Sequence, residues 1–305
     1  MIKTETLGLL GSLKKLAKSR ISMLFAFTAS AALGTLIAGK GFPPIIPTIL
    51  AIVSTLFITL SVYLYNDIID LEMDKESKSI NKEDRPLVTG EVSVKNTVII
   101  IAVSSIIGLS ISWLINPVTF VIALSYWVIF ALYSFPSIRF KRIFVVKTLI
   151  TSLGPALTLL LGMSSVLGKV YPLGLFTAFI QWGFLFLMLP SLADSFDLEE
   201  DSKYGMKTMG MVFSWKTKTR MLLFAPILAT IASLIGLYVF NLSPVFPVLS
   251  VASSVLFGKS IIKIMNEYQE EEVWKVRKLG FIYYDLNLIF VLLGTLNFGS
   301  MLALF

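Results

Sequence analysis

The chain of 305 residues contains no cysteine and no histidine. Their absence excludes disulfide bonds, thiolate chemistry, haem ligation by histidine and histidine-based zinc sites. It also removes the most frequent general base of enzymes. Any polar chemistry must therefore come from carboxylates, lysine, arginine, tyrosine, hydroxyls or amides.

Charge is scarce as well, because Asp, Glu, Lys and Arg make up only 15% of the residues and 56% are hydrophobic. A soluble domain carries about a quarter charged residues. Together with a mean hydropathy of +0.83, this composition indicates a membrane protein. The net charge of +7 comes from basic residues spread among loops, so we expect no nucleic-acid partner.

Nine apolar segments are long enough to cross a bilayer, which takes about 20 residues. We predict an all-α integral membrane protein with about nine transmembrane helices in one domain over 1–305, and residues 1–20 as a cytoplasmic lead-in helix. No cleavage pattern follows these residues, so we expect no signal peptide. The predicted spans are 21–39, 45–65, 97–115, 117–135, 144–163, 171–191, 221–240, 244–262 and 279–303.

Basic residues lie almost entirely on one side of these spans. With the N-terminus placed in the cytoplasm, all of the 26 basic residues except Lys40 and Lys169 fall on the cytoplasmic side. This bias predicts a multi-pass protein of the cell membrane with its N-terminus inside and its C-terminus outside. No acidic residue falls in a predicted external loop, so the polar chemistry is expected on the cytoplasmic face.

The second predicted span runs into an acidic cluster. Asn66, Asp70 and Asp74 are spaced i, i+4 and i+8, which places them on one face of a continued helix. Their negative charges repel one another, and the helix dipole is unfavourable to anions at this end. A divalent cation would make the arrangement favourable, and oxygen ligands suit a hard ion such as Mg²⁺.

The sixth predicted span ends in a second acidic cluster, in which Asp194, Asp197 and Asp201 are spaced i, i+3 and i+7. On a helix these residues also share one face. Facing clusters on the same side of the membrane would hold two or more Mg²⁺ ions around one diphosphate. The alternative is that both clusters are solvated loop charge, but the matching spacing of two separate clusters favours a site.

The two clusters resemble the two motifs of the UbiA prenyltransferase superfamily. The first motif, N-D-x-x-D-x-x-x-D, matches Asn66, Asp67, Asp70 and Asp74, and the second, D-x-x-D-x-x-x-D, matches the later triplet. Three more stretches are similar to family elements, whereas Glu200 stands where many members have glycine. These stretches are Asn81-Lys82-Glu83-Asp84-Arg85-Pro86-Leu87 with Gly90, Tyr133-Ser134-Phe135-Pro136 with the basic residues Arg139, Lys141 and Arg142, and Gly205-Met206-Lys207-Thr208.

This resemblance implies a nine-helix bundle around a central cavity and a Mg²⁺-dependent transfer from a prenyl diphosphate. It assigns metal binding to Asn66, Asp67, Asp70, Asp74, Asp194, Asp197 and Asp201. Arginine and lysine suit diphosphate contact, for which the candidates are Arg85, Arg139, Lys141 and Lys203. Their alternative role is topology-setting loop charge. The expected catalytic groups are Asp70, Asp74, Asp197, Asp201 and Tyr133, whose ring would face an allylic cation.

The resemblance implies a lipophilic acceptor in the membrane, and no obligate protein partner is evident. The run D-R-P-L-x-x-G resembles both archaeal digeranylgeranylglyceryl phosphate synthases and chlorophyll or homogentisate-type enzymes. We prefer geranylgeranyl transfer to geranylgeranylglyceryl phosphate, with an aromatic quinone precursor as the alternative acceptor. Asp285, inside the last span, is a candidate for orienting the acceptor or for bonding a neighbouring helix.

Two other classes of protein compete with this interpretation. A transporter would explain many spans with acidic residues, but its charges should lie near the membrane midplane rather than at helix ends. A CDP-alcohol phosphotransferase also uses Mg²⁺ and aspartates, but its D-G and A-R elements are missing from this sequence. The prenyltransferase interpretation is therefore preferred.

Overall fold

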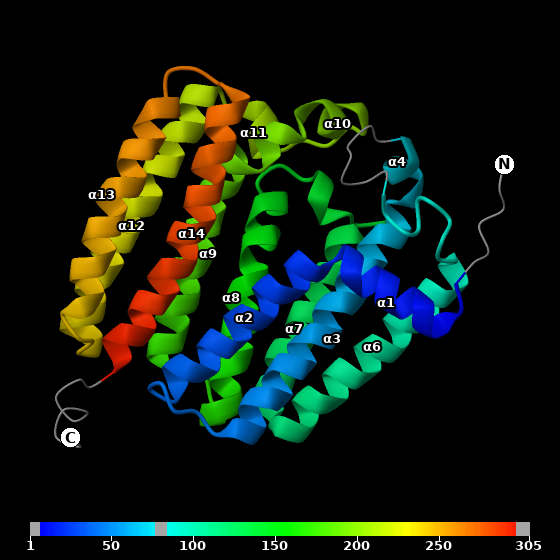
Figure 1. The fold of residues 1–305 in the computed structure, drawn as a ribbon, viewed down its shortest axis with the longest axis horizontal. Coiled ribbons are helices and arrows are strands. Elements are labelled where there is room, and N and C mark those ends of the chain that lie inside the picture. Colours follow the sequence, from blue (N-terminus) through cyan, green and yellow to red (C-terminus); the bar gives the residue numbers. More distant parts are fainter. Residues whose placement is uncertain (1–6, 77–83, 297–305) are drawn as a thin grey trace.

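The computed structural model describes residues 7–76 and 84–296, and the regular elements within them are helices (Figure 1). They are α1 (Leu9–Ser19), α2 (Ile21–Ala38), α3 (Ile45–Ile69), α4 (Leu71–Glu76), α6 (Val94–Ile115), α7 (Pro117–Ser134), η1 (Phe140–Arg142), α8 (Val146–Leu167), α9 (Pro172–Leu192), η2 (Asp194–Phe196), α10 (Leu198–Lys203), α11 (Met209–Val212), α12 (Trp215–Phe240), α13 (Val245–Ile264) and α14 (Glu270–Thr295).

Within the described residues, eight of the long helices are apolar enough over at least 18 residues to cross a membrane, and α14 is a ninth long helix. The predicted all-α, multi-span fold is therefore confirmed. The ninth predicted span starts at residue 279, within α14, and the helix itself begins earlier, at Glu270. Three glutamates occupy its first turn, where the helix dipole favours negative charge. Residues 297–303 of that predicted span lie outside the described part of the chain.

Polar residues define the turns between spans. Asn116 caps α7, because its Oδ1 accepts the backbone N–H of Thr119 at 2.9 Å, and Pro117 follows at the first helical position. The Nδ2 of Asn116 also donates to the carbonyl of Ser164 at 3.0 Å, which ties this turn to the end of α8. Asn241 ends α12 in the left-handed conformation, with φ of 52°.

Helices α2 and α8 approach each other very closely at two glycines. A Cβ on Gly34 would lie 2.2 Å from the carbonyl oxygen of Leu159, and one on Gly162 would lie 2.0 Å from that of Ala31. Small residues permit this packing, which supplies van der Waals contact where lipid provides no hydrophobic driving force between helices. In Figure 1, α8 stands between α3, α6 and α7 on one side and α9 and α12–α14 on the other, and α2 runs across it.

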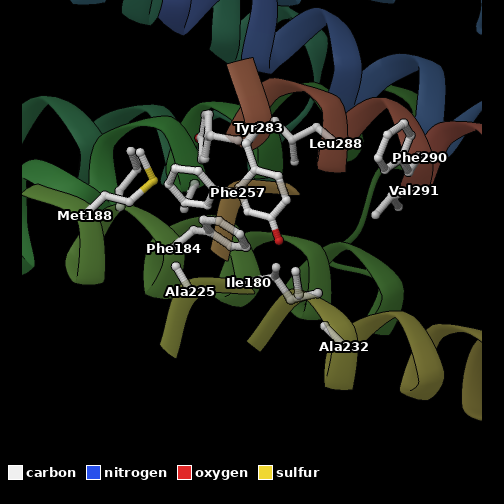
Figure 2. Close-up of a cluster of buried hydrophobic side chains, with 14 of the residues drawn as sticks. Ile180, Phe184, Met188, Ala225, Ala232, Phe257, Tyr283, Leu288, Phe290 and Val291 are labelled. Carbon is white, nitrogen blue, oxygen red and sulfur yellow. The ribbon is translucent and has the colours of Figure 1, made fainter. Parts of the chain in front are cut away.

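Among the described residues, the largest buried apolar cluster lies mainly on α9, α12, α13 and α14, with further members on α2 and α8 (Figure 2). Phe257 stacks on Tyr283 with ring centroids 4.6 Å apart, and Phe184 packs against the same tyrosine at 5.2 Å. The Tyr283 hydroxyl lies 2.7 Å from that of Ser254, so its polar end is hydrogen-bonded within the bundle. The short helices α4, α10 and α11 lie together at one end of this bundle.

Candidate active site

The first acidic cluster spans the junction of α3 and α4. The backbone hydrogen bonds continue across the junction, from Asp70 N–H to Asn66 and from Asp74 N–H to Asp70, so the helical spacing is maintained. The Asn66 Nδ2 donates to Asp70 Oδ2 at 2.9 Å and to Ser134 Oγ on α7 at 2.7 Å. As the spacing predicts, Asn66 and Asp70 therefore lie side by side on one face.

Two arginines hold the outer acids of this cluster. Arg20, at the end of α1, donates two N–H groups to the Asp67 carboxylate, with its Nε 2.9 Å from Oδ2. Arg85 contacts Asp74 and lies 3.4 Å from Asp67 Oδ1. Burial, together with the nearby Arg85 charge, lowers the pKa of Arg20 to about 10, so it remains protonated at neutral pH. The fork of each guanidinium suits such pairing with a carboxylate.

Asp70 receives basic side chains from the segment that follows α7. Lys141 donates to Asp70 Oδ1, and Arg139 lies 3.3 Å from the same oxygen and 3.1 Å from the sulfur of Met73. Burial lowers the pKa of Lys141, and the charge of Asp70 opposes this shift. Arg139 has a φ of 46°, a strained backbone conformation for a residue with a side chain. Such strain is concentrated at functional sites in proteins.

The spacing of the second acidic cluster predicted one continuous helix, but the structure shows a break there. Helix α9 ends at Leu192, Asp194 opens the 3₁₀ turn η2, and Asp201 lies in the following α10. The cluster is nevertheless assembled, because Lys147 at the start of α8 lies 3.2 Å from Asp194 and 3.0 Å from Asp201. Asp197 ends η2, within electrostatic range of Arg277 on α14.

The two acid-bearing segments meet directly. Tyr204, just after α10, donates its hydroxyl to the carbonyl of Met73 in α4 at 3.2 Å, and Lys203 pairs with Glu76 at 3.0 Å. Tyr133 lies within electrostatic range of Asp70 in the first cluster and of acids in the second. The sequence predicted Lys203 as a diphosphate contact, and the structure places it at the rim with a side chain that is 56% exposed.

The two clusters offer the oxygen donors that Mg²⁺ prefers. Among residues 7–76 and 84–296, no three acidic side chains lie close enough together to surround one metal ion. The negative charge of the carboxylates, which a cation was expected to balance, is balanced by arginine and lysine side chains. Asp194 Oδ2, however, is buried without a hydrogen-bond partner in the described structure, which leaves it available to a ligand. The residues present therefore fit a hard divalent ion.

Sequence reasoning missed three basic residues that the structure brings to the clusters, namely Arg20, Lys147 and Lys218. Each lies near the start of a span, so the sequence analysis used its charge only to predict the orientation of the chain in the membrane. Asp285 is exposed on α14, and the stretch Asn81-Lys82-Glu83 lies outside the described residues.

The profile of the UbiA prenyltransferase family matches residues 25–284 of the chain. The chain therefore belongs to the UbiA prenyltransferase family, and it is a multi-pass membrane prenyltransferase. This assignment decides against the transporter and the CDP-alcohol phosphotransferase.

Two relatives of known activity illustrate the range of the family. The chain is 25% identical over 269 residues to protoheme IX farnesyltransferase of Acinetobacter baylyi, covering 87% of this chain and 88% of the relative. It is 31% identical over 143 residues to digeranylgeranylglyceryl phosphate synthase of Sulfurisphaera tokodaii, covering 47% and 49%. These two relatives use different acceptors, so similarity to them alone leaves the acceptor open.

Solved structures of similar fold cover nearly the whole chain. A structure from a study of digeranylgeranylglyceryl phosphate synthase in membranes gives a TM-score of 0.73 at 22% identity, covering 93% of this chain and 99% of that one. A UbiA homolog from Archaeoglobus fulgidus bound to GPP and Mg²⁺ gives a TM-score of 0.66 at 21% identity, covering 91% and 99%. These likenesses establish the shared fold.

Proposed function

We propose that this enzyme transfers a polyprenyl group, preferably geranylgeranyl, from its diphosphate to geranylgeranylglyceryl phosphate. The observation that carries the proposal is the set of buried and half-buried basic side chains against two joined acidic clusters. A prenyl diphosphate and a phosphate-bearing acceptor together bring several negative charges to one place. Pre-positioned arginine and lysine side chains would neutralise those charges in a site that excludes water. These side chains are Arg20, Arg85, Arg139, Lys141 and Lys147.

The diphosphate is the leaving group, so negative charge grows on its oxygens as the C–O bond breaks. Arg85, Arg139 and Lys141 approach the first cluster, and Lys147 approaches the second. Each donates to a carboxylate and would donate to diphosphate oxygens when the donor binds. The arginines suit paired contacts with phosphate oxygens, whereas the lysines act as point charges.

Mg²⁺, when bound, supplies positive charge that stabilises the departing diphosphate. The residues that would hold it are Asn66, Asp70, Asp74, Asp194, Asp197 and Asp201. Asp67 was predicted as a further ligand, but its two arginine contacts favour an anchoring role. The A. fulgidus homolog bound to GPP and Mg²⁺ supports this choice of donor class and metal.

The allylic carbon becomes positive as the diphosphate leaves. Tyr133 is partly buried against the apolar cluster of α3, α7 and α8, and its ring lies 6.3 Å from that of Phe130. An aromatic face in such a place attracts a cation and excludes water. We assign Tyr133 to stabilising this charge. The positive-inside bias supports a cytoplasmic site with the N-terminus inside and the C-terminus outside.

A second candidate acceptor has support from one observation. The alignment with protoheme IX farnesyltransferase spans 87% of the chain, which is more than the alignment with the digeranylgeranylglyceryl phosphate synthase spans. Protohaem is also lipophilic and carries carboxylates that basic residues would attract. An aromatic quinone precursor is the third acceptor, in keeping with the resemblance of the D-R-P-L-x-x-G run.

A direct assay tests the proposal. Purified protein in lipid vesicles would receive Mg²⁺, labelled geranylgeranyl diphosphate and one of three acceptors: geranylgeranylglyceryl phosphate, protohaem or an aromatic quinone precursor. We expect a prenylated product with the first acceptor, and its loss on chelation by EDTA. Product with only one of the other acceptors would contradict the acceptor assignment, and product that persists in EDTA would contradict the metal assignment.

A further inference from the structure

Lys218 is a buried lysine on the first turns of α12 that belongs to neither acidic motif. Its side chain is 4% exposed, and its Nζ donates to Ser195 Oγ at 2.7 Å and to the carbonyl of Gly210 at 2.9 Å. Both acceptors are neutral. Burying an ammonium group is costly unless its contacts compensate, so this arrangement calls for an explanation.

The first contact of Lys218 fixes the turn that carries the second acidic cluster. Ser195 stands in η2 directly after Asp194, and its hydroxyl donates to the carbonyl of Pro190 at 3.1 Å. Lys218 thus joins a chain of hydrogen bonds that runs through η2 to the last turn of α9. Because η2 is a single 3₁₀ turn, its own hydrogen bonds are few and these side-chain contacts restrain it.

The second contact of Lys218 holds α11 against the same aspartate. A Cβ on Gly210 would lie 2.5 Å from Cβ of Asp194, so the two backbones are in close contact. Lys218 is anchored on its own helix, where its Nζ lies 5.5 Å from the ring centre of Trp215. The indole of Trp215 donates to the carbonyl of Ile264 at 2.6 Å, which fixes the ring against α13.

We propose that Lys218 is a positioning residue that orients the Asp194 carboxylate, and thereby sets the affinity of the second cluster for Mg²⁺. Lys218 restrains Asp194 from two directions, through Ser195 within η2 and through Gly210 packed on it. Loss of its donors removes the N–H groups that two buried acceptors receive from Lys218, which releases the turn. The inference rests on the proposed function, because it assumes that Asp194 holds a metal.

The test compares Lys218→Met with Lys216→Met, a change at an exposed lysine two residues earlier on the same helix. Binding of Mg²⁺ to each purified variant would be measured by titration calorimetry, with thermal unfolding in EDTA as a check on folding. Loss of groups that orient metal ligands typically weakens metal affinity about 10- to 100-fold, which we expect for Lys218→Met alone. Lys218→Arg keeps N–H donors and should recover part of the affinity.

Ser195→Ala is the second variant, because it removes one acceptor while leaving the buried charge in place. It should weaken Mg²⁺ binding less than Lys218→Met does. Failure of the wild-type protein to bind Mg²⁺ would overturn the proposed metal function itself. If wild type binds and Lys218→Met matches Lys216→Met, the positioning role is wrong. If Lys218→Met does not fold, unchanged affinity in folded Ser195→Ala likewise overturns the positioning role.

Discussion

At the residue scale, charge pairing in the site joins segments that are far apart in the sequence. Asp67 receives Arg20 from 47 residues before it and lies beside Arg85 from 18 residues after it. It thereby joins the end of α1 and the described segment around Arg85 to the end of α3. Asp70, one turn further on, contacts Lys141 and Arg139 instead. Neighbouring acids of one motif thus have different surroundings and are expected to respond differently to mutation.

The Asp67→Asn variant is expected to lose stability rather than metal affinity. Removing one partner of a buried ion pair costs about 3 kcal/mol or more, because the other charge stays buried. The midpoint of thermal unfolding in detergent would measure this loss. Glu72→Gln provides the control, since the Glu72 side chain is 85% exposed beside Lys75 and should change little. Equal stability of the two variants would contradict the anchoring role of Asp67.

Substitutions of Tyr133 test whether its aromatic ring stabilises the allylic cation. Tyr133→Phe keeps the ring and should retain most of the turnover rate, whereas Tyr133→Leu removes the aromatic face. A desolvated cation–π contact contributes about 2 kcal/mol, so Tyr133→Leu should lower kcat by roughly tenfold or more. Single-turnover kinetics with bound donor would measure the chemical step. A Tyr133→Phe variant as slow as Tyr133→Leu would instead assign the role to the hydroxyl.

At the scale of single elements, helix spacing predicted contacts between residues of one helix. It did not predict contacts between residues of different helices. The i, i+4 spacing placed Asn66 beside Asp70, because the helix geometry continues across the α3–α4 junction. The spacing did not predict that the second cluster is divided between η2 and α10, after α9 has ended. Lys147 reaches Asp201 across 54 residues, a contact that depends on how α8 packs and that no periodicity encodes.

The glycine contact between α2 and α8 gives a prediction for these elements. Gly162→Val would place a side chain 2.0 Å from the carbonyl of Ala31, and a backbone atom cannot yield as a flexible side chain can. We expect destabilisation of at least about 3 kcal/mol, seen as an earlier thermal transition and poor yield of folded protein. Gly258→Ala on α13 is the control, because no atom lies within 4 Å of its added Cβ. Similar unfolding of both variants would contradict the close packing.

At the scale of the whole molecule, composition and the positive-inside bias predicted a multi-span helical fold, and the motifs predicted the family. The ninth predicted span covers the later, apolar part of α14, and the sequence did not predict that the helix begins earlier, at the charged Glu270–Glu272. The sequence predicted that the clusters share one side. It did not identify the contacts that join them, between Tyr204 and Met73 and between Lys203 and Glu76.

Membrane orientation is testable because the chain has no cysteine of its own. Lys169→Cys, between α8 and α9, should react with an impermeant maleimide added outside intact cells. Lys203→Cys, at the end of α10, should react only after the membrane is opened. This outcome follows from the bias of basic residues toward the cytoplasm. The reverse labelling pattern would place the site on the outer face.

The convergence of both acidic clusters on one diphosphate is tested most directly by a double-mutant cycle. Binding of a prenyl diphosphate would be measured with and without Mg²⁺ for wild type, Asp70→Asn, Asp197→Asn and the double variant. If both clusters act on the same diphosphate, binding requires Mg²⁺ and the double variant loses much less than the sum of the two single losses. Additive losses, or equally tight binding in EDTA, would contradict the account.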